Sequence, residues 1–354
     1  MSRYWSETLK GIDPYVPGEQ PGDKKYIKLN TNENPYPPSP RVLEKIRKVA
    51  DGRLRLYPDP ECEDLREALA EYHKLDKSQV YAGNGSDELL AFTFLAFFNP
   101  TGLPILFPDI TYSFYPVYSN LFKIRYRQIP LDGSFNVPAE QFYAENGGII
   151  IPNPNAPTGK YLPVDSIGEI LRRNRQSVVV VDEAYVDFGG ESAVKYIEEH
   201  PNLLVVRTLS KSHSLAGMRV GYVLGNEELI EGIARIKNSV NSYTLDRIAL
   251  AAAVEAIKDT AYFHETRKKI INTRERVSRE LKNMGFNVVD SMANFIFTAH
   301  PSVPACEIFR RLRERGILVR HFKKPRIDNY LRVSVGSDEE MFCFLNEIGG
   351  IAGF

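Results

Sequence analysis

Short apolar runs alternate with helical or turn-rich stretches through the middle of the chain. Six of these runs are predicted to be strands, and they cover residues 104–107, 124–129, 148–151, 178–181, 203–206 and 220–224; the run at 203–206 has the length and the β-branched content of a buried strand. Residues 111–118 and 163–173 are predicted to form helices between them. Continuous apolar strands that alternate with helices are typical of a mostly parallel sheet covered on both faces. We therefore expect an α/β fold built on such a sheet.

The two ends of the chain differ from this middle part. The residues before position 27 are rich in proline and glycine, which favours an extended arm. Residues 226–258 and 261–284 are predicted to be helical, and the segments after them suggest a smaller α+β domain. We expect three parts: an N-terminal arm (1–27), a large domain (28–257) and a small C-terminal domain (258–354).

The charge balance and the cysteines limit the classes of partner. Lys plus Arg equals Asp plus Glu, 45 of each, which gives no support for a nucleic-acid or anionic-membrane partner. Cys62, Cys306 and Cys343 have neither metal-ligand spacing nor a disulfide framework, which favours a reducing compartment and no metal site. The sequence contains no apolar signal region and no run of about 18 apolar residues. We expect a cytoplasmic protein without membrane segments.

A lysine in an unusual setting follows one of the predicted strands. Residues 208–219 read T-L-S-K-S-H-S-L-A-G-M-R, and they place Lys211 just beyond the end of that strand. The carboxyl ends of strands are where ligands bind in open α/β sheets. Thr208, Ser210 and Arg219 supply two hydroxyls and a guanidinium, which suit a phosphate held beside an amine. A lone lysine is usually a solvated surface residue, so this stretch alone leaves both interpretations open.

Other predicted strand ends carry polar residues as well. Asp182 follows the apolar run 178–181, where an aspartate is costly unless a cation meets it. A glycine-containing turn at residues 81–88 leads into an apolar helix, and free backbone N–H groups at such a helix start suit an anion, although these turns are common. An aspartate, a tyrosine, an amide and a lysine beside a phosphate cradle match the needs of pyridoxal phosphate. This cofactor requires a lysine for its aldehyde, an anion for its pyridinium proton and donors for its ring oxygen and phosphate.

Three motifs in this order carry a specific resemblance to a known family. They are N-P-N-A-P-T-G at residues 153–159, D-E-A-Y at 182–185 and the lysine stretch at 208–219. The chain resembles the fold-type I, class II pyridoxal-phosphate-dependent aminotransferases, and more closely the histidinol-phosphate aminotransferases among them. The resemblance covers nearly the full chain, from the N-E-N-P turn at 32–35 to N-Y-L-R-V-S-V-G at 329–336.

The resemblance implies roles for the residues of these motifs. Lys211 would bind the cofactor covalently and then act as the general base. Asp182 would pair with the pyridine nitrogen, and Tyr185 would hydrogen-bond the ring oxygen. The other implied cofactor-binding residues are Gly85, Ser86, Asp87, Tyr112, Asn155, Thr208, Ser210, Arg219 and Tyr57. Tyr112 would stack on the ring, and Tyr57 would reach the phosphate from a second subunit, which implies a homodimer with shared active sites.

The implied reaction is a transamination in histidine biosynthesis. It transfers an amino group from L-histidinol phosphate to 2-oxoglutarate, which gives imidazole acetol phosphate and L-glutamate. The implied substrate-binding residues are Tyr15, Asn34, Arg320 and Arg332, and Arg332 would hold the carboxylate or the phosphate of the substrates. Guanidinium groups suit either anion, so charge alone does not distinguish the two.

The chain departs from the usual pattern of the family at two positions. Many members carry asparagine just before Pro-Thr-Gly, where it bonds the ring oxygen, whereas this chain has Ala156. Asn155, one position earlier, is the candidate replacement. His213, beside the lysine, is expected to pack against its neighbours and not to act as a catalytic base.

Three other functions remain open on the sequence. Two are enzymatic: transamination of aromatic amino acids, and decarboxylation of a phosphorylated amino acid on closely similar motifs. The third is a binding-only regulator, which would predict an added DNA-binding module and a lost lysine. The sequence carries no such module and retains Lys211.

Overall fold

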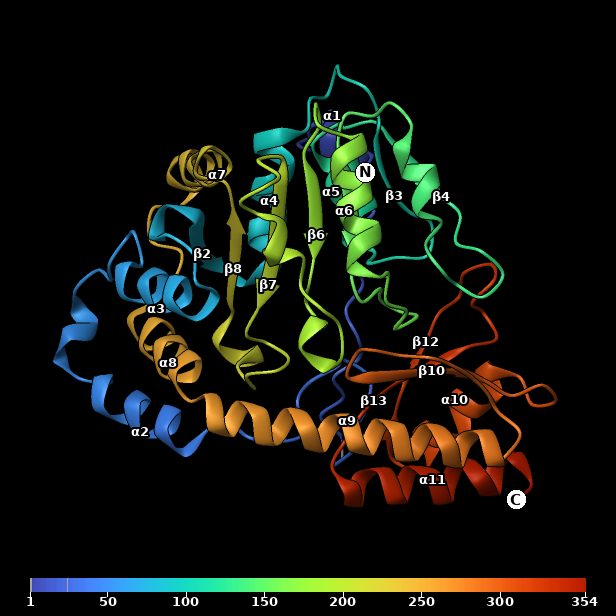
Figure 1. Cartoon of the computed structure of the whole chain (residues 1–354). Helices are drawn as coiled ribbons and strands as arrows, with labels where there is room; N and C mark the ends of the chain where they lie inside the picture. The colour runs from blue at the N-terminus through green and yellow to red at the C-terminus, as the bar shows by residue number, and fades with distance from the viewer. Residues whose placement is uncertain (1, 24) are drawn as a thin grey trace.

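A seven-stranded sheet lies at the centre of the computed structural model, which describes residues 2–23 and 25–354 (Figure 1). Its strands lie in the order β2-β8-β7-β6-β5-β3-β4. β8 is antiparallel to both of its neighbours, and the other pairs are parallel. The strands are β2 (Val80–Asn84), β3 (Ile105–Pro108), β4 (Tyr126–Ile129), β5 (Ile149–Pro152), β6 (Val179–Asp182), β7 (Leu203–Thr208) and β8 (Val220–Gly225). The expected α/β fold with a mostly parallel sheet is confirmed.

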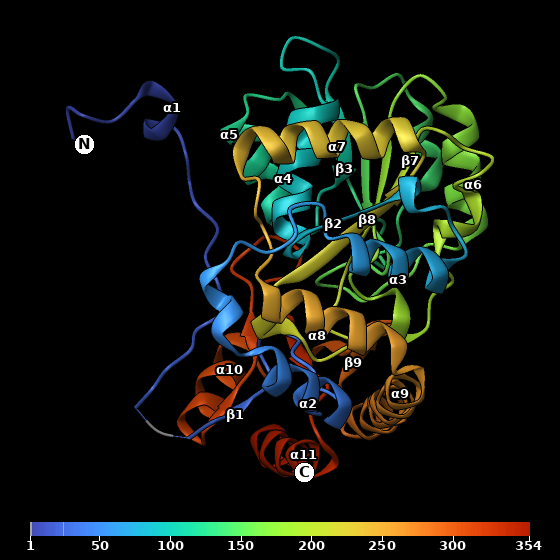
Figure 2. The ribbon, with the colours of Figure 1, turned by 90° about the vertical axis from the view of Figure 1, so that its left-hand side faces the viewer.

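Successive residues of the central strands are buried in two different cores, one on each face of the sheet. On β6, Val179 and Val181 belong to one core, whereas Val180 belongs to the other, as the two-residue period of a strand requires. The first core is covered by α2 (Pro40–Val49), α3 (Glu63–His73), α6 (Val164–Arg173) and α8 (Arg247–Lys258). The second is covered by α4 (Gly85–Phe97), α5 (Phe114–Leu121) and α7 (Glu227–Val240) (Figure 2).

A smaller antiparallel sheet packs at the C-terminal end of the chain. It consists of β9 (Asn287–Val289), β10 (Phe295–Ala299), β12 (Arg320–His321) and β13 (Leu331–Ser334), in the order β12-β13-β10-β9. Its core includes apolar residues of α9 (Thr260–Asn283), α10 (Ala305–Glu314) and α11 (Asp338–Ala352). In Figure 1, α9 extends from beside α8 to the small sheet, so this long helix connects the two parts.

The residues that follow the N-terminal arm pack with the C-terminal part of the chain. β1 (Ile27–Lys28) pairs in parallel with β11 (Ile317–Leu318), and Leu29 is buried in the core of the small sheet. The arm itself contains a short helix, α1 (Glu7–Lys10), whose first turn is capped by the side chain of Ser6. In Figure 2, the arm carries α1 to one side, apart from the rest of the ribbon.

Several predicted element bounds were wrong. The helical stretch expected over 226–258 is two helices, because α7 ends at Val240 and α8 begins at Arg247. The Asp246 carboxylate accepts from two N–H groups at the start of α8, which allows a new helix to begin there. The helix expected over 111–118 begins at Phe114, and the strand expected over 124–129 begins at Tyr126. Within the described part of the chain, no helix has the length and apolar character needed to cross a membrane.

Strand direction brings several chain segments to one edge of the large sheet. The parallel strands β5, β6 and β7 end there, and Asp182 is the last residue of β6. Because β8 is antiparallel, it begins at the same edge, where Gly221 pairs with Thr208. β2 ends beside it, with Asn84 opposite Val220, and leads directly into α4. The polar residues predicted at these strand ends therefore meet.

Candidate active site

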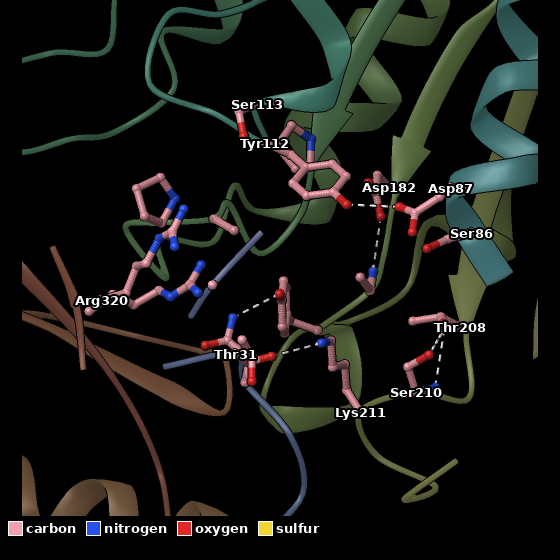
Figure 3. A pocket seen from close by; sticks show the side chains of 18 of the residues that line it. Thr31, Ser86, Asp87, Tyr112, Ser113, Asp182, Thr208, Ser210, Lys211 and Arg320 are labelled. Carbon is pink, nitrogen blue, oxygen red and sulfur yellow. Dashed lines mark hydrogen bonds between the residues drawn. The ribbon is translucent and has the colours of Figure 1, made fainter. Parts of the chain in front are cut away.

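A pocket opens where these strands end, and residues of the arm, the large sheet and the small sheet line it (Figure 3). Most of the predicted site residues lie on its wall: Tyr15, Ser86, Asp87, Tyr112, Asp182, Tyr185, Thr208, Ser210, Lys211, Arg219, Arg320 and Arg332. Gly85, Asn34, Asn155 and Tyr57 are predicted site residues that are not part of this wall. The structure therefore joins segments that are as much as three hundred residues apart along the chain.

Lys211 enters the pocket just after β7. Its Nζ donates to the backbone oxygen of Thr31 at 3.2 Å, a contact visible in Figure 3. Burial, together with the positive charge of Arg332, lowers the pKa of Lys211 to about 8. About a tenth of the amine is therefore unprotonated at pH 7, far more than for an ordinary lysine, and this is the form that a nucleophile or general base requires.

Asp182 is buried on the face of the sheet that α5 covers, because it has the same strand parity as Val180. Its Oδ2 accepts from the hydroxyl of Tyr115 at 2.8 Å, and its Oδ1 accepts from the backbone N–H of Ala184 at 3.2 Å. Burial raises the pKa of this carboxyl group to about 6. The groups that counter the effect of burial are these two hydrogen-bond donors, and neither carries a positive charge.

This arrangement tests whether the pyridoxal phosphate expected from the sequence fits. A buried carboxylate without a cationic partner is costly, and a protonated pyridine nitrogen would supply the missing cation. Asp182 lines the same pocket as the Lys211 amine. The donor set therefore fits the cofactor on electrostatic grounds.

Tyr185 lies between the large sheet and the small sheet. Its ring meets Phe295 of β10 edge-on, with a centroid distance of 5.1 Å. Its hydroxyl oxygen accepts from Nδ2 of Asn32 at 2.9 Å. Burial raises the pKa of Tyr185, whereas Arg332 and the Asn32 amide act in the opposite direction. The phenol therefore remains protonated near neutral pH and can donate.

The N-terminus of α4 and the β7–β8 connection form an anion cradle. α4 begins at Gly85, whose φ of +77° is readily adopted by glycine. A Cβ on Gly85 would lie 2.5 Å from Nη2 of Arg219, and one on Gly221 would lie 2.5 Å from the carbonyl carbon of Gly85. Both glycines therefore permit a close approach that side chains would block. Free N–H groups at a helix start suit a phosphate.

Side chains complete this cradle. The Thr208 hydroxyl donates to Oγ of Ser210 at 2.9 Å, and Ser86 lines the pocket beside them (Figure 3). Nη2 of Arg219 donates to Oδ2 of Asp87 at 3.1 Å, so part of its charge is already neutralised. The same carboxylate accepts from the Tyr112 hydroxyl at 2.8 Å, which holds the tyrosine ring at the pocket wall.

Two arginines of the small sheet face the pocket from the other side. Arg332 donates to the backbone oxygen of Asn30 at 3.0 Å, while its buried Nε has no partner among the described residues. Arg320 donates to the backbone oxygens of Val16 and Pro17 in the arm. Tyr15 of the arm also lines the pocket and stacks on Phe114, with a centroid distance of 4.3 Å. The remaining donors of the arginines are suited to an anionic ligand.

Three predicted site residues make contacts with other residues of this chain and do not line the pocket. Asn155 is fully buried, and its Nδ2 donates to the Ile110 backbone oxygen and to Thr158, while Ala156 lines the pocket instead. Asn34 donates to the backbone oxygens of Lys211 and Ser212. Its amide therefore holds the backbone around Lys211 in place and does not face a ligand. Tyr57 is 78% exposed and stacks on Tyr243, outside the pocket of its own chain.

His213 packs as the sequence suggests. Its ring stacks on Phe263 with a centroid distance of 4.6 Å, and burial lowers its pKa to about 4. Its Nδ1 lies 3.0 Å from Oγ of Ser212, which donates to the partly buried Asp187 carboxylate. Ser212, the residue directly after Lys211, is thereby linked through Asp187 to the buried Arg207.

Sequence reasoning missed three residues that contact the predicted site. Tyr115 donates to Asp182, Thr31 accepts from Lys211, and Asn32 donates to Tyr185. The signal for Tyr115 is its position three residues after Tyr112, although only Tyr115 lies within α5 and Tyr112 precedes that helix. Thr31 and Asn32 belong to a polar turn, and nothing in its local pattern indicates which of its side chains faces the pocket.

Comparisons with known proteins agree with this geometry. Residues 24–348 match the family described as aminotransferase class I and II. Curated proteins named histidinol-phosphate aminotransferase are similar to this chain over 348 residues. The protein of Clostridium acetobutylicum is 58% identical, and the match covers 98% of this chain and 99% of that protein. The protein of Clostridium beijerinckii is 54% identical, and the match covers 98% of this chain and 97% of that protein. A crystal structure of histidinol-phosphate aminotransferase from Sinorhizobium meliloti in complex with pyridoxal-5′-phosphate has a TM-score of 0.89 at 26% identity, over 100% of this chain and 98% of that one. From its sequence, its fold and its pocket, the chain belongs to the class I and II aminotransferases.

Proposed function

We propose that this chain is a pyridoxal-phosphate-dependent aminotransferase that transfers an amino group from L-histidinol phosphate to 2-oxoglutarate in histidine biosynthesis. The observation that carries the reaction class is that the Lys211 amine and the Asp182 carboxylate line one pocket at adjacent strand ends. The substrate rests on relatives with 54–58% identity over nearly the full chain, all named histidinol-phosphate aminotransferase.

The residues of the pocket fit the cofactor at each of its polar ends. Asp182 would hold a proton on the ring nitrogen, and Tyr185 would donate to the ring oxygen. Gly85, Ser86, Thr208, Ser210 and Arg219 would hold the phosphate. Tyr112 would cover the ring face. The bound cofactor supplies an aldehyde that joins to amines and a ring that withdraws electrons from the adjacent carbon.

The side chains of the pocket then bind the substrate and move its proton. Arg332 and Arg320 would hold the anionic group of either substrate and place the reacting carbon of that substrate near Lys211. Nζ of Lys211 would be placed to take the proton from the carbon of the bound substrate. The pKa of about 8 suits Nζ to this task near neutral pH. Tyr15 on the arm, which lines the pocket and stacks on Phe114, would help to exclude water from it.

The active enzyme in this proposal is a cytoplasmic homodimer with shared sites. Tyr57 is exposed, it stacks on Tyr243, and it lies outside the pocket of its own chain, so it is free to reach a second copy. The arm likewise exposes Tyr4 and Trp5, which are 80% and 46% accessible. Exposed apolar groups are typical of protein interfaces where they form a contiguous patch, and Tyr4 and Trp5 are adjacent in the chain. Small-molecule substrates are the other partners, with no nucleic acid or membrane.

The decisive experiment measures glutamate formed from 2-oxoglutarate by the purified protein with pyridoxal phosphate. L-histidinol phosphate should support turnover well above that with phenylalanine or tyrosine, and Lys211→Ala should abolish it. Faster turnover with the aromatic amino acids would replace the proposed substrate. Release of carbon dioxide from a phosphorylated amino acid, without glutamate formation, would indicate a decarboxylase instead.

A further inference from the structure

We propose that Asn32 is a positioning residue that directs the phenolic proton of Tyr185 towards the cofactor-binding pocket. The inference rests on the function proposed above, because it concerns the hydrogen bond that Tyr185 offers to the ring oxygen of the cofactor. Asn32 lies in the polar turn between β1 and α2 and is 1% exposed.

Four hydrogen bonds fix the backbone and the side chain of Asn32, and one of them runs from Oγ of Ser334 to its Oδ1. Its N–H donates to Oγ of Ser334 at 2.8 Å, and its backbone oxygen accepts from Nδ2 of Asn294 at 2.9 Å. Its side-chain Nδ2 donates to the hydroxyl oxygen of Tyr185 at 2.9 Å. Its φ of +56° lies in the left-handed region, which asparagine tolerates better than most residues. A buried turn anchored to the small sheet thus presents one amide to one phenol.

The donor and acceptor count fixes which way this amide points. Oγ of Ser334 accepts from the Asn32 N–H and has a single proton of its own, which it donates to Oδ1 of Asn32 at 3.2 Å. If the amide were turned over, Nδ2 would face Ser334. The buried Ser334 proton would then lose the only acceptor that the described contacts give it, at a cost of about 1–3 kcal/mol. Oδ1 therefore faces Ser334, and Nδ2 faces Tyr185.

This orientation determines what Tyr185 can do. Because its oxygen accepts from Asn32, the phenolic proton is left for another acceptor. The ionisable groups that act on Tyr185 are Arg332 on β13, Asp182 on β6 and Tyr15 on the arm, and Arg332 is only a donor. Ala156, where the sequence could have supplied a second amide, presents a methyl group to the pocket. Tyr185 is therefore the side chain suited to donate to the ring oxygen, with Asn32 holding it in that role.

The test is a pH titration of the visible absorbance of the holoenzyme without substrate. A hydrogen-bond donor to the ring oxygen lowers the pKa of the nitrogen that would join Lys211 to the cofactor. Loss of that donor should therefore raise this pKa, which is the midpoint of the titration. Asn32→Gly accepts the positive φ and removes the amide. Asn32→Asp keeps the shape but turns the donor into an acceptor, which would capture the Tyr185 proton. Each variant should raise the midpoint by about half to one pH unit.

A double-mutant comparison separates positioning from a general structural effect. Tyr185→Phe should raise the midpoint, and adding Asn32→Gly to it should produce no further rise, because Asn32 acts through Tyr185. Asn174→Ala is the matched control, since Asn174 is also a buried asparagine and donates to the backbone of Phe142 and Ile170, remote from the pocket. It should lower the melting temperature without moving the midpoint. If Asn32→Gly does not fold, Ser334→Ala removes the proton that orients the amide and should shift the midpoint in the same direction.

The outcomes distinguish this inference from the proposed function. An unchanged midpoint in Asn32→Gly and Asn32→Asp, or additive shifts in the double variant, would overturn the positioning role while leaving the aminotransferase intact. A wild-type protein that develops no visible band with pyridoxal phosphate would instead refute the proposed function itself.

Discussion

The hydroxyl of Tyr115 lies 2.8 Å from Oδ2 of Asp182 and joins the start of α5 to the end of β6. This hydrogen bond satisfies one oxygen of a buried carboxyl group whose pKa no cation among the described residues is found to shift. The pair is a site prepared for a positively charged ligand atom, and its cost to the cofactor-free protein can be measured.

Asp182 should destabilise the cofactor-free protein as the pH rises. Its pKa is about 6 in the folded state, above the ordinary value of 3.8, so folding takes up a proton between these values. Stability is therefore lost as the pH rises through this window, by on the order of 3 kcal/mol. Asp182→Asn keeps an oxygen for Tyr115 and removes the charge. Thermal denaturation of the cofactor-free proteins should show the variant melting higher at pH 8, with the difference shrinking at pH 4.5.

The same variant, Asp182→Asn, should bind pyridoxal phosphate more weakly, because it offers no charge to the ring nitrogen.

A melting difference that is equal at both pH values would show that the Asp182 carboxyl group is not the source of the effect. Tyr115→Phe serves as the comparison, since it retains the charge but removes one donor from it. Its cofactor-free form should lose stability at high pH relative to the wild type.

Gly85 should be intolerant of even the smallest side chain. Alanine at this position would be strained at a φ of +77°, and its Cβ would displace the Arg219 guanidinium. We expect Gly85→Ala to weaken cofactor binding by about tenfold or more, as measured by fluorescence titration. Gly133→Ala is the control, because a Cβ there meets nothing within 4 Å. Equal affinities in the two variants would contradict the role of the α4 N-terminus as the phosphate cradle.

Strand ends were predictable from the sequence because buried parallel strands leave a strong local signal. The runs at 178–181 and 203–206 placed Asp182 and Lys211 correctly at one edge of the sheet, and the structure confirms that β6 and β7 are neighbours. The break between α7 and α8 was missed, because it depends on the Asp246 cap and not on the apolar pattern.

Contacts between distant segments could not be predicted from local patterns. The partnership of Asn32 with Tyr185, and of Asn155 with Ile110, depends on how the small sheet and the turns pack. The division of the chain near Lys258 stays a prediction. Residues 27–29, which the sequence placed at the border of the arm and the large domain, pack with β11 and the core of the small sheet.

Arg332 should govern the affinity for both substrates. Its Nη2 is held by Asn30, its Nε has no partner among the described contacts, and Phe295 and Phe322 lie beside its guanidinium. Arg332→Ala should raise KM for histidinol phosphate and for 2-oxoglutarate by about 30-fold to 100-fold, the loss of a charge-assisted hydrogen-bond pair. Arg332→Lys should recover only part of this affinity. Arg315→Ala, which removes an exposed ion pair with Glu347, should leave both KM values unchanged. An increase confined to one substrate would mean that the two anions use different sites.

Tyr57 provides the sharpest test of shared sites, because it is exposed and does not line the pocket of its own chain. Tyr57→Ala should weaken cofactor retention by about tenfold if its hydroxyl reaches a phosphate across a dimer interface. Refolding an equal mixture of Tyr57→Ala and Lys211→Ala chains should create hybrid dimers with one intact site each. Random pairing makes half of the dimers hybrid, so about a quarter of all sites should be restored. At limiting pyridoxal phosphate, borohydride reduction followed by mass spectrometry should find the recovered label on the Tyr57→Ala chain. If mixing restores no cofactor retention, Tyr57 does not contact the cofactor of a second chain, and the two pockets of a dimer would be independent.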